Sequence, residues 1–206
     1  MSSHHFVKEH QEPAIILHKL DDFPYSKLGD LLEWAPKVIC LVEAIDLALI
    51  YGFKIDGIAG KSSEISAYTN RQDHLEMLAI EGPIWNGLMQ KLLSLNAQGA
   101  YLITSEDDVP NLLGQIMPLA DKLDLQVLTP QKRHVLSRNL SWKKWVTGSG
   151  SYTIRSLEDN SKLSATVLGQ HKFKNSRSST LNIAYQGEGF IEINSSVCPF
   201  LISDHL

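Results

Sequence analysis

Short apolar runs alternate with stretches of helical periodicity over the first two thirds of the chain, up to about residue 136. The run Val38–Val42 is apolar throughout, as expected for a strand that is covered on both faces of a sheet. Together the apolar runs predict six strands, which are Ala14–Leu17, Val38–Val42, Ile55–Ala59, Leu75–Ile80, Ala100–Thr104 and Leu125–Leu128.

The stretches between these runs carry apolar residues every three or four positions, the spacing that gathers them on one side of an α-helix. The clearest predicted helix is Pro83–Asn96, and the others are Tyr25–Trp34, Glu43–Tyr51 and Val109–Leu123. Because strands and helices alternate, we expect an α/β fold with a mainly parallel, Rossmann-like sheet and helices on both of its faces.

After residue 136 the helical periodicity ends. Short strand candidates separated by Gly, Asn and Ser turns replace it, and they are Ser151–Arg155, Leu163–Leu168, Thr180–Tyr185, Phe190–Ile193 and Phe200–Ser203. This pattern predicts a small all-β sandwich. We therefore expect two domains, residues 1–136 and residues 137–206, with their boundary inside Lys132–Lys144.

The composition narrows the function only loosely. With 206 residues, of which 43% are hydrophobic and 20% charged, the chain has the composition of an ordinary globular protein. Its net charge of -4 gives no general attraction to nucleic acid or to an anionic membrane. No apolar run reaches the roughly 20 residues that span a bilayer. Cys40 and Cys198 lie in unrelated settings, which favours reduced thiols and a cytoplasmic location.

The segment Lys54–Ile65 carries the most informative pattern, a buried strand that runs into a glycine turn. In an α/β protein such a turn lies at the carboxyl end of a strand, where ligands bind. Its letters, K-I-D-G-I-A-G-K-S-S-E-I, resemble the P-D-x-I-I-G-D-x-D-S-I signature of thiamine pyrophosphokinases. Asp56 and Gly60 fit that signature, whereas Lys61 and Ser63 stand at the positions of its two metal-binding aspartates.

The resemblance implies a fold and a reaction. Thiamine pyrophosphokinases join an α/β domain, which handles ATP and Mg²⁺, to a β-sandwich that helps to bind thiamine in a site shared across a homodimer. They transfer a pyrophosphoryl group from ATP to the thiamine hydroxyl. Because Mg²⁺ needs carboxylate ligands beside the phosphates, an active relative should carry acidic residues at several strand ends. On this resemblance the first domain is nucleotide-binding-like and the second is thiamine-binding-like.

The other motifs of the family are matched only in part. Its A-D-G-G-A motif falls at Glu43–Ala48, where Glu43 replaces the aspartate and larger residues replace the glycines. Its K-D-x-T-D motif falls at Ala79–Pro83 and leaves only Glu81. Its G-x-x-G-G-R-x-D-H motif falls at Thr104–Val109, which lacks the glycines, the arginine and the histidine. The framework of the family is present, and most of its acidic groups are replaced.

The candidate site residues follow from these matches. The catalytic candidates are Asp56, Lys61 and Glu81. The nucleotide-binding candidates are Glu43, Gly60, Ser63 and Asp107. The thiamine-binding candidates are Trp145, Ser179 and Asn182, since an indole suits stacking on the thiazolium cation and the segment around Asn182 resembles the family's S-N strand start. No complete metal site is expected, and Mg²⁺ is implied as a cofactor only if the protein is active.

Each candidate also has a purely structural interpretation. Asp56 and Gly60 would then only end a strand and form a turn, and Lys61 would be a solvated turn lysine. The acidic run Glu106–Asp108 would begin a helix, where the helix dipole favours negative charge. Trp145 would fill the seam between the two domains.

Three functions remain open. The first is a thiamine-pyrophosphokinase-like protein with weak or lost transfer from ATP to thiamine and a retained binding or structural role. The second is an active kinase with a metal site rebuilt from Glu43, Asp56, Glu81 and Asp107. The third is a non-enzymatic interaction module. The resemblance implies thiamine, thiamine diphosphate and ATP as ligands and a homodimer as the assembly, with neither nucleic acid nor membrane as a partner.

Overall fold

The computed structural model describes residues 13–33, 37–71, 74–158, 161–168, 170–173 and 179–205. The chain divides into two compact units, Met1–Leu123 (unit 1) and Asp124–Leu206 (unit 2). The sequence pattern placed the boundary after residue 136, which lies inside strand β7 (Lys132–Ser137) of unit 2. The difference arises because apolar runs mark strands without showing which compact unit each strand joins.

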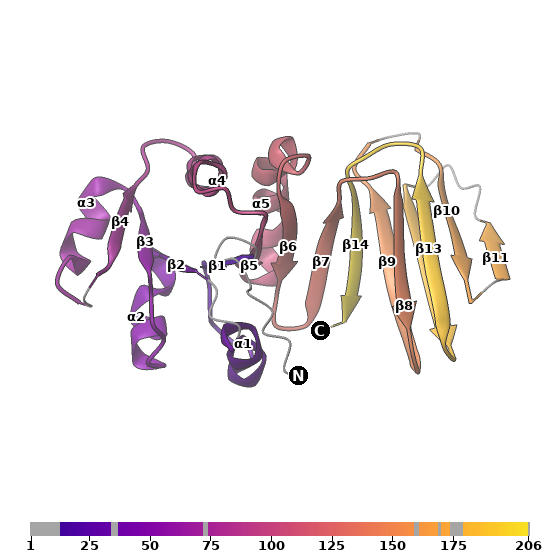
Figure 1. Ribbon diagram of the computed structural model, residues 1–206, viewed down its shortest axis with the longest axis horizontal. Helices are drawn as coiled ribbons and strands as arrows, with labels where there is room; N and C mark the ends of the chain where they lie inside the picture. Colours follow the sequence, from indigo (N-terminus) through magenta and orange to yellow (C-terminus); the bar gives the residue numbers. More distant parts are fainter. Residues whose placement is uncertain are drawn as a thin grey trace, which may run out of the picture. The chain divides into compact units, whose positions relative to one another are not determined.

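Unit 1 is built on five parallel strands: β1 (Ala14–Leu17), β2 (Val38–Leu41), β3 (Gly57–Gly60), β4 (Glu76–Ala79) and β5 (Gly99–Ile103). They pair in the order β5-β1-β2-β3-β4 (Figure 1). The central strand places Ile16 between Ile39 of β2 and Leu102 of β5, and all three side chains are completely buried. The parallel sheet expected from the apolar runs is therefore present in this unit.

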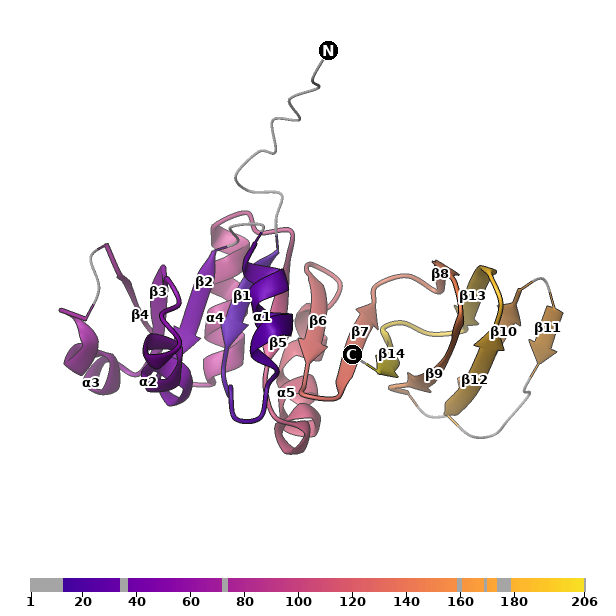
Figure 2. The same ribbon diagram turned by 90° about the horizontal axis from the view of Figure 1, so that it is seen from below.

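Helices cover both faces of this sheet. Figures 1 and 2 show α1 (Tyr25–Leu32) and α2 (Val42–Ile50) on one face and α4 (Ile84–Ser94) on the other. α5 (Val109–Ile116) packs against α4. Four short segments complete the unit, and they are α3 (Ser62–Ile65) and the 3-10 turns η1 (Ser66–Tyr68), η2 (Glu106–Asp108) and η3 (Met117–Leu119).

The order of connection reverses beside β1. The chain moves outward from β1 through β2 and β3 to β4, and then returns through α4 to β5, on the other side of β1. In open α/β sheets, ligands bind outside the carboxyl ends of the strands at such a switch point. The carboxyl ends of β1 and β5 are therefore the expected place for a ligand.

Unit 2 consists of two antiparallel sheets. One has the order β6-β7-β14-β9-β12 and the other β8-β13-β10-β11. The strands other than β7 are β6 (Asp124–Leu128), β8 (Ser141–Val146), β9 (Ser149–Ser156), β10 (Leu163–Val167), β11 (Gln170–Phe173), β12 (Thr180–Gln186), β13 (Gly189–Ser195) and β14 (Phe200–His205).

The two sheets of unit 2 enclose one apolar core. Ile154 of β9 and Phe200 of β14 come from the first sheet, and Ile193 of β13 comes from the second. Each of these side chains is completely buried. The expected small β-sandwich is present. The chain as a whole is an α/β protein with an added antiparallel part, so the expectation of a mainly parallel sheet holds for unit 1 alone.

Three strands of unit 2 were not expected from the sequence, namely β7, β8 and β11. In β8, exposed and less exposed residues alternate, as in any strand with one covered face. A lysine stands on each face, however, because Lys143 is exposed and Lys144 is half-buried. A period of two is therefore hidden in the hydrophobic pattern. Over the residues that the structure describes, no helix combines the length and the apolar character needed to cross a membrane.

Candidate functional site

Five connections follow the five parallel strands at the carboxyl ends of unit 1, and the one after β2 is the start of α2 itself. Two of them meet at the switch point, where His18 and Lys19 come after β1, and Thr104 to Asp108 come after β5. Glu43 follows β2, Lys61 follows β3 and Glu81 follows β4. We call the residues that follow the carboxyl ends of these five strands the carboxyl edge.

His18 is the central side chain of the switch point. Its Nδ1 lies 2.8 Å from Oγ1 of Thr104, a residue that is only 1% exposed. Its backbone N–H donates to the carbonyl oxygen of Ile103 at 2.9 Å. Its ring meets Trp85 of α4 edge-on, with 5.1 Å between the ring centres. The imidazole is therefore fixed between two strands and a helix.

Burial lowers the pKa of His18 below its ordinary value of 6.5, against the raising effects of the Asp108 and Glu43 carboxylates. The imidazole is therefore neutral near pH 7. In that form one ring nitrogen donates a hydrogen bond and the other accepts one.

Beside His18, an ion pair joins the loops after β1 and β5. Nζ of Lys19 lies 2.7 Å from Oδ2 of Asp108, and Oγ of Ser105 donates to the same oxygen at 2.6 Å. The hydrogen bond from Lys19, and then that from Ser105, lowers the pKa of Asp108. The carboxylate is thus ionised and already bound to protein donors.

Gly60 ends β3 where α2 and α3 approach it. A Cβ at this position would lie 2.7 Å from Cγ2 of Val42 and 3.0 Å from Cγ2 of Ile65. These contacts are too short, so glycine is required here by packing within the protein. This accounts for Gly60 without a ligand, although it was predicted as a nucleotide-binding residue.

The loop after β3 presents ammonium and hydroxyl groups. The side chain of Lys61 is 66% exposed, with its Nζ 3.9 Å from Oε1 of Glu64. The backbone N–H of Lys61 donates to the other carboxylate oxygen of Glu64 at 3.2 Å. Ser62 donates from its Oγ to Oε1 of Glu81 at 3.0 Å, and Ser63 is exposed. The loops after β3 and β4 are thereby connected.

Asp56 lies at the other edge of the sheet. It precedes β3, and its Oδ2 accepts a hydrogen bond from the backbone N–H of Val38 at 2.8 Å. Lys54 places its Nζ 3.4 Å from Oδ1. The strand of four residues that separates Asp56 from Lys61 is about 13 Å long, at about 3.3 Å per residue. The structure therefore does not bring Asp56 together with Lys61 and Glu81, and its contacts connect the starts of β2 and β3.

The acidic groups of the carboxyl edge are not gathered into one cluster in the described part of the chain. Mg²⁺ demands near-octahedral oxygen ligands, usually including one or two carboxylates. Asp108 is engaged by Lys19 and Ser105, and Glu81 by Ser62. Glu43, in the first turn of α2, and Asp107, in η2, are exposed on separate elements. Among the described residues no three His, Cys, Asp or Glu side chains are grouped closely enough to hold a metal ion.

The thiamine-binding candidates of unit 2 lie on different sheets. Trp145 of β8 is 52% exposed and meets Phe190 of β13 edge-on, with 4.8 Å between the ring centres. Asn182 of β12 is exposed between two buried neighbours, so it points outward from the other sheet. Ser179 precedes β12 and accepts a hydrogen bond from Ser156 N–H at 2.7 Å through its carbonyl oxygen. Within unit 2 these residues do not form one pocket.

Sequence reasoning missed His18, Lys19 and Trp85. The first two directly follow an apolar strand, a position that signals a site in an α/β fold. The contact between His18 and Thr104 joins residues 86 positions apart, which no local pattern shows. Trp85 lay inside the predicted helix Pro83–Asn96 and was given no role of its own.

The chain combines an α/β unit, which carries the switch-point site, with a β-sandwich unit. Solved structures with the same combination are known. The thiamin pyrophosphokinase from Candida albicans is similar over 98% of this chain and 91% of its own, with a TM-score of 0.69 and 10% identity. The thiamin pyrophosphokinase family protein from Enterococcus faecalis is similar over 95% of this chain and 99% of its own, with a TM-score of 0.67 and 8% identity. The enzyme from Bacillus subtilis is similar over 94% and 98%, with a TM-score of 0.64 and 12% identity.

The chain thus has a thiamin-pyrophosphokinase-like fold, and the resemblance read from its motifs is confirmed at the level of the fold. No protein-family model matches the sequence, and no curated protein matches it either.

Proposed function

We propose that this protein is a thiamine-pyrophosphokinase-like binding protein with weak or lost transfer of pyrophosphate from ATP to thiamine. The observation that carries the proposal is the state of the acidic groups at the carboxyl edge. Asp108 is neutralised by Lys19, and lysine and serine follow β3 where the family's signature has two aspartates. Asp108 and Glu81 would each have to leave a protein partner before they could share a metal ion.

The same edge suits phosphate oxygens without a metal. The exposed ammonium of Lys61 and the exposed hydroxyl of Ser63 are hydrogen-bond donors. A lysine binds phosphate as a point charge and needs no fixed geometry to do so. We therefore propose thiamine diphosphate or the phosphate chain of ATP as the ligand of this edge, with no cofactor.

Binding and turnover separate this proposal from an active kinase. Isothermal titration with thiamine, thiamine diphosphate and ATP, each with and without Mg²⁺, should show binding of a phosphorylated ligand that does not require Mg²⁺. A coupled assay with ATP, Mg²⁺ and thiamine should show no turnover above the background. Turnover that depends on Mg²⁺ would refute the loss of catalysis.

A matched pair of lysines tests the position of the ligand. Lys61→Gln should weaken binding about tenfold or more, because one charge-assisted contact to phosphate is lost. Lys54→Gln changes the same charge at the opposite edge of the sheet and should leave binding within about twofold. Equal effects of both variants would show only a general electrostatic attraction.

An active kinase with a rebuilt metal site needs Asp56 beside Glu43, Glu81 and Asp107. The position of Asp56 at the amino end of β3 argues against that assembly. A non-enzymatic interaction module has one observation in its favour, the exposed aromatic pair of Trp145 and Phe190 on unit 2. If the protein bound none of the phosphorylated ligands, the interaction module would be favoured.

A further inference from the structure

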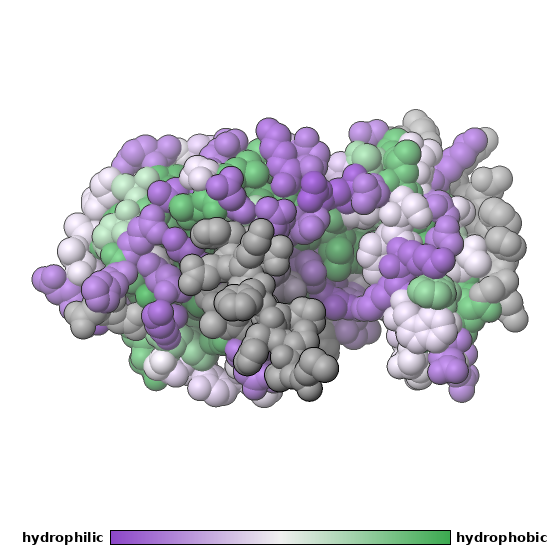
Figure 3. Space-filling model, viewed as in Figure 1, coloured by the Kyte–Doolittle hydropathy of each residue, from purple (hydrophilic) through white to green (hydrophobic). Residues whose placement is uncertain are grey.

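Two charged side chains of the first sheet of unit 2 point toward the second sheet. Alternate residues of a strand share one face. Asp204 of β14 shares its face with Ile202, which lies in the buried core between the sheets. Arg133 of β7 shares its face with Val135, which packs against the same core. Figure 3 shows hydrophilic surface where Figure 1 draws the lower ends of β7 and β14.

Arg133 and Asp204 form an ion pair within their own sheet. They lie directly opposite each other in the antiparallel register of β7 and β14. Nε of Arg133 donates to Oδ1 of Asp204 at 3.0 Å, and Nη2 donates to Oδ2. The guanidinium thus binds the carboxylate at two points, and the two charges offset each other.

Lys144 of the second sheet faces this pair. Along β8 it alternates with Trp142 and Val146, whose side chains belong to the core of the sandwich or pack against it. Its Nζ lies 3.9 Å from Oδ2 of Asp204, which is too far for a hydrogen bond. It also lies 5.7 Å from the centre of the Tyr152 ring. Within the described part of the chain, no hydrogen bond of this half-buried ammonium is found.

The three charges leave one positive charge in excess. Arg133 and Asp204 offset each other, so the excess is that of Lys144. Burial, and then the charge of Arg133, lowers the pKa of Lys144, so its surroundings stabilise the ammonium less than water does. An anion beside Lys144 would balance it. A monoanion matches the single excess charge, whereas a phosphate dianion would bring a second negative charge close to the Asp204 carboxylate.

Aromatic rings border the ammonium. Tyr152 is only 4% exposed and stacks on Tyr185, with 5.9 Å between the ring centres. On β8, Trp142 meets Tyr152 edge-on at 5.6 Å and is half-buried, so part of its indole is accessible. Trp142 and Lys144 are two residues apart on one face, which places them about 7 Å apart at about 3.4 Å per residue. This spacing suits a ligand with a charged end and an apolar body.

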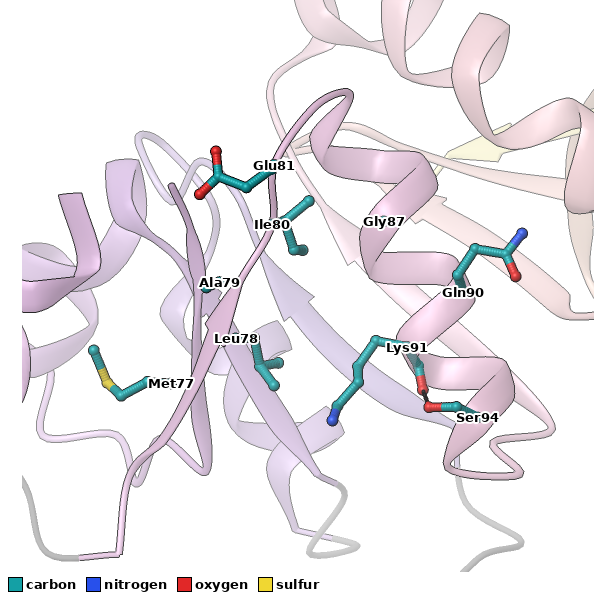
Figure 4. Close-up of a pocket in the computed structure, with 9 residues that line it drawn as sticks. All are labelled: Met77, Leu78, Ala79, Ile80, Glu81, Gly87, Gln90, Lys91 and Ser94. Atoms are coloured by element: carbon teal, nitrogen blue, oxygen red, sulfur yellow. Dashed lines mark hydrogen bonds between the residues drawn. The ribbon is translucent and has the colours of Figure 1, made fainter. Parts of the chain in front are cut away.

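The charged groups beside the largest groove of unit 1 are in a different state. That groove, of about 630 Å³, lies between β4 and α4 (Figure 4). Lys91 places its Nζ 3.3 Å from Oε1 of Glu76, and its carbonyl oxygen accepts a hydrogen bond from Ser94 at 2.6 Å. Glu81 accepts a hydrogen bond from Ser62 at 3.0 Å. These groups are already engaged within the protein, in contrast to the ammonium of Lys144.

We propose that Lys144 binds the carboxylate of a small organic acid whose apolar body packs against the indole of Trp142. The site lies within unit 2, between β8 and the sheet that carries the Arg133–Asp204 pair. It is independent of the carboxyl edge of unit 1 and of the function proposed for that edge.

A structural role for Lys144 predicts different behaviour. Among the described residues β8 pairs only with β13, so it is the last strand of its sheet. An inward-pointing charge on such a strand can serve to prevent pairing with other chains. In that case Lys144→Gln would increase self-association and would leave the binding of a carboxylate unchanged.

Titration of the full-length, ¹⁵N-labelled protein with sodium benzoate, followed by NMR, tests the site. Benzoate in the millimolar range should shift the indole N–H signal of Trp142 to saturation, and Trp142→Phe identifies that signal. Lys144→Gln should weaken binding about tenfold or more, because a charge-assisted hydrogen bond is lost. Lys144→Arg retains the charge and should retain binding.

Lys143→Gln is the matched control. Lys143 is the preceding residue and carries the same charge, but it points outward, with its Nζ 4.4 Å from the centre of the Phe190 ring. Its substitution should leave benzoate binding within about twofold, because alternate residues of a strand face opposite sides. An unchanged melting temperature shows that each variant folds.

Other ligands separate this site from the carboxyl edge. Benzyl alcohol lacks the charge, and inorganic phosphate lacks the apolar body, so both should bind more weakly than benzoate. Lys61→Gln should leave benzoate binding unchanged, and Lys144→Gln should leave the binding of thiamine diphosphate unchanged. The two proposals can therefore fail separately.

Three results would overturn the proposal. The first is a shift of the Trp142 signal that does not saturate with benzoate in the wild-type protein. The second is benzoate binding that a folded Lys144→Gln protein retains in full. The third is tighter binding of inorganic phosphate than of benzoate, which would exclude the carboxylate as the preferred group. The first and third need no variant of Lys144.

Discussion

The substitution Gly60→Ala separates a packing role of this glycine from a ligand role. The backbone of Gly60 is not in the left-handed region, so alanine adds a steric problem and no backbone strain. Its Cβ would lie 2.7 Å from Val42 Cγ2 and 3.0 Å from Ile65 Cγ2. Both neighbours would have to move.

The magnitude follows from two opposing effects. Overpacking in a well-packed region costs about 1–3 kcal/mol. Alanine in place of glycine restricts the unfolded chain and returns about 0.4–1 kcal/mol. We expect a net loss of about 1–2 kcal/mol in the free energy of unfolding, which lowers the melting temperature by about 2–4 °C per kcal/mol for a chain of this size.

Urea unfolding followed by far-UV circular dichroism measures this loss, because the helices of the described chain all lie in unit 1. Gly114→Ala in α5 is the control, since a Cβ there meets nothing within 4 Å. It should stabilise the protein by about 0.5–1 kcal/mol through helix propensity.

A double substitution completes the test. Val42→Ala removes the closest clashing methyl group, so the loss in Gly60→Ala/Val42→Ala should be smaller than the sum of the two single losses by about 1 kcal/mol. Strict additivity, or a neutral Gly60→Ala, would refute the steric argument. A double variant that regains stability yet fails to bind thiamine diphosphate would show that Gly60 faces the ligand.

Three further predictions concern the two edges of the sheet. Burial lowers the pKa of His18 in the folded state, so its contribution to stability is present above pH 6.5 and declines as the pH falls below that value; His18→Gln should flatten this part of a melting-temperature profile. The pKa of the Asp108 carboxyl is also lowered in the folded state, so this group stabilises the fold above pH 3.8, the ordinary pKa, and the stabilisation is lost as the pH falls below that value. Asp108→Asn should remove this dependence on pH in the acid range and should cost about 1–2 kcal/mol of the free energy of unfolding at neutral pH, measured by urea unfolding. Asp56→Ala should cost about 1–3 kcal/mol by leaving the Val38 N–H without its acceptor, and ligand binding measured by titration should persist; a loss of binding in a folded Asp56→Ala protein would contradict its structural role.

Local patterns were enough to predict most of unit 1. The strand Ala14–Leu17 was predicted with the bounds that β1 has, and Pro83–Asn96 encloses α4. These elements are long or fully apolar, so their period stands out from neighbouring residues. α3 was missed because four residues are too few to show a helical period.

The position of Asp56 illustrates the limit of motif spacing. The predicted strand Ile55–Ala59 contained this residue, whereas β3 begins at Gly57. Asp56 therefore lies just before β3, where its carboxylate accepts the Val38 N–H, and not at the carboxyl end beside the loop after Gly60. Strand ends depend on pairing with β2 and β4, which the sequence of the segment does not contain.

By itself, the sequence determined the order of strands and helices, the change to an all-β part, and the lysine and serine after Gly60 where the signature it resembles has aspartates. Only the tertiary structure decided that His18, Thr104 and Asp108 share a site while Asp56 lies outside it. The physical reason is that periodicity and turn chemistry act between near neighbours in the chain. The environment of an ionisable side chain depends instead on residues that pairing of distant strands brings beside it.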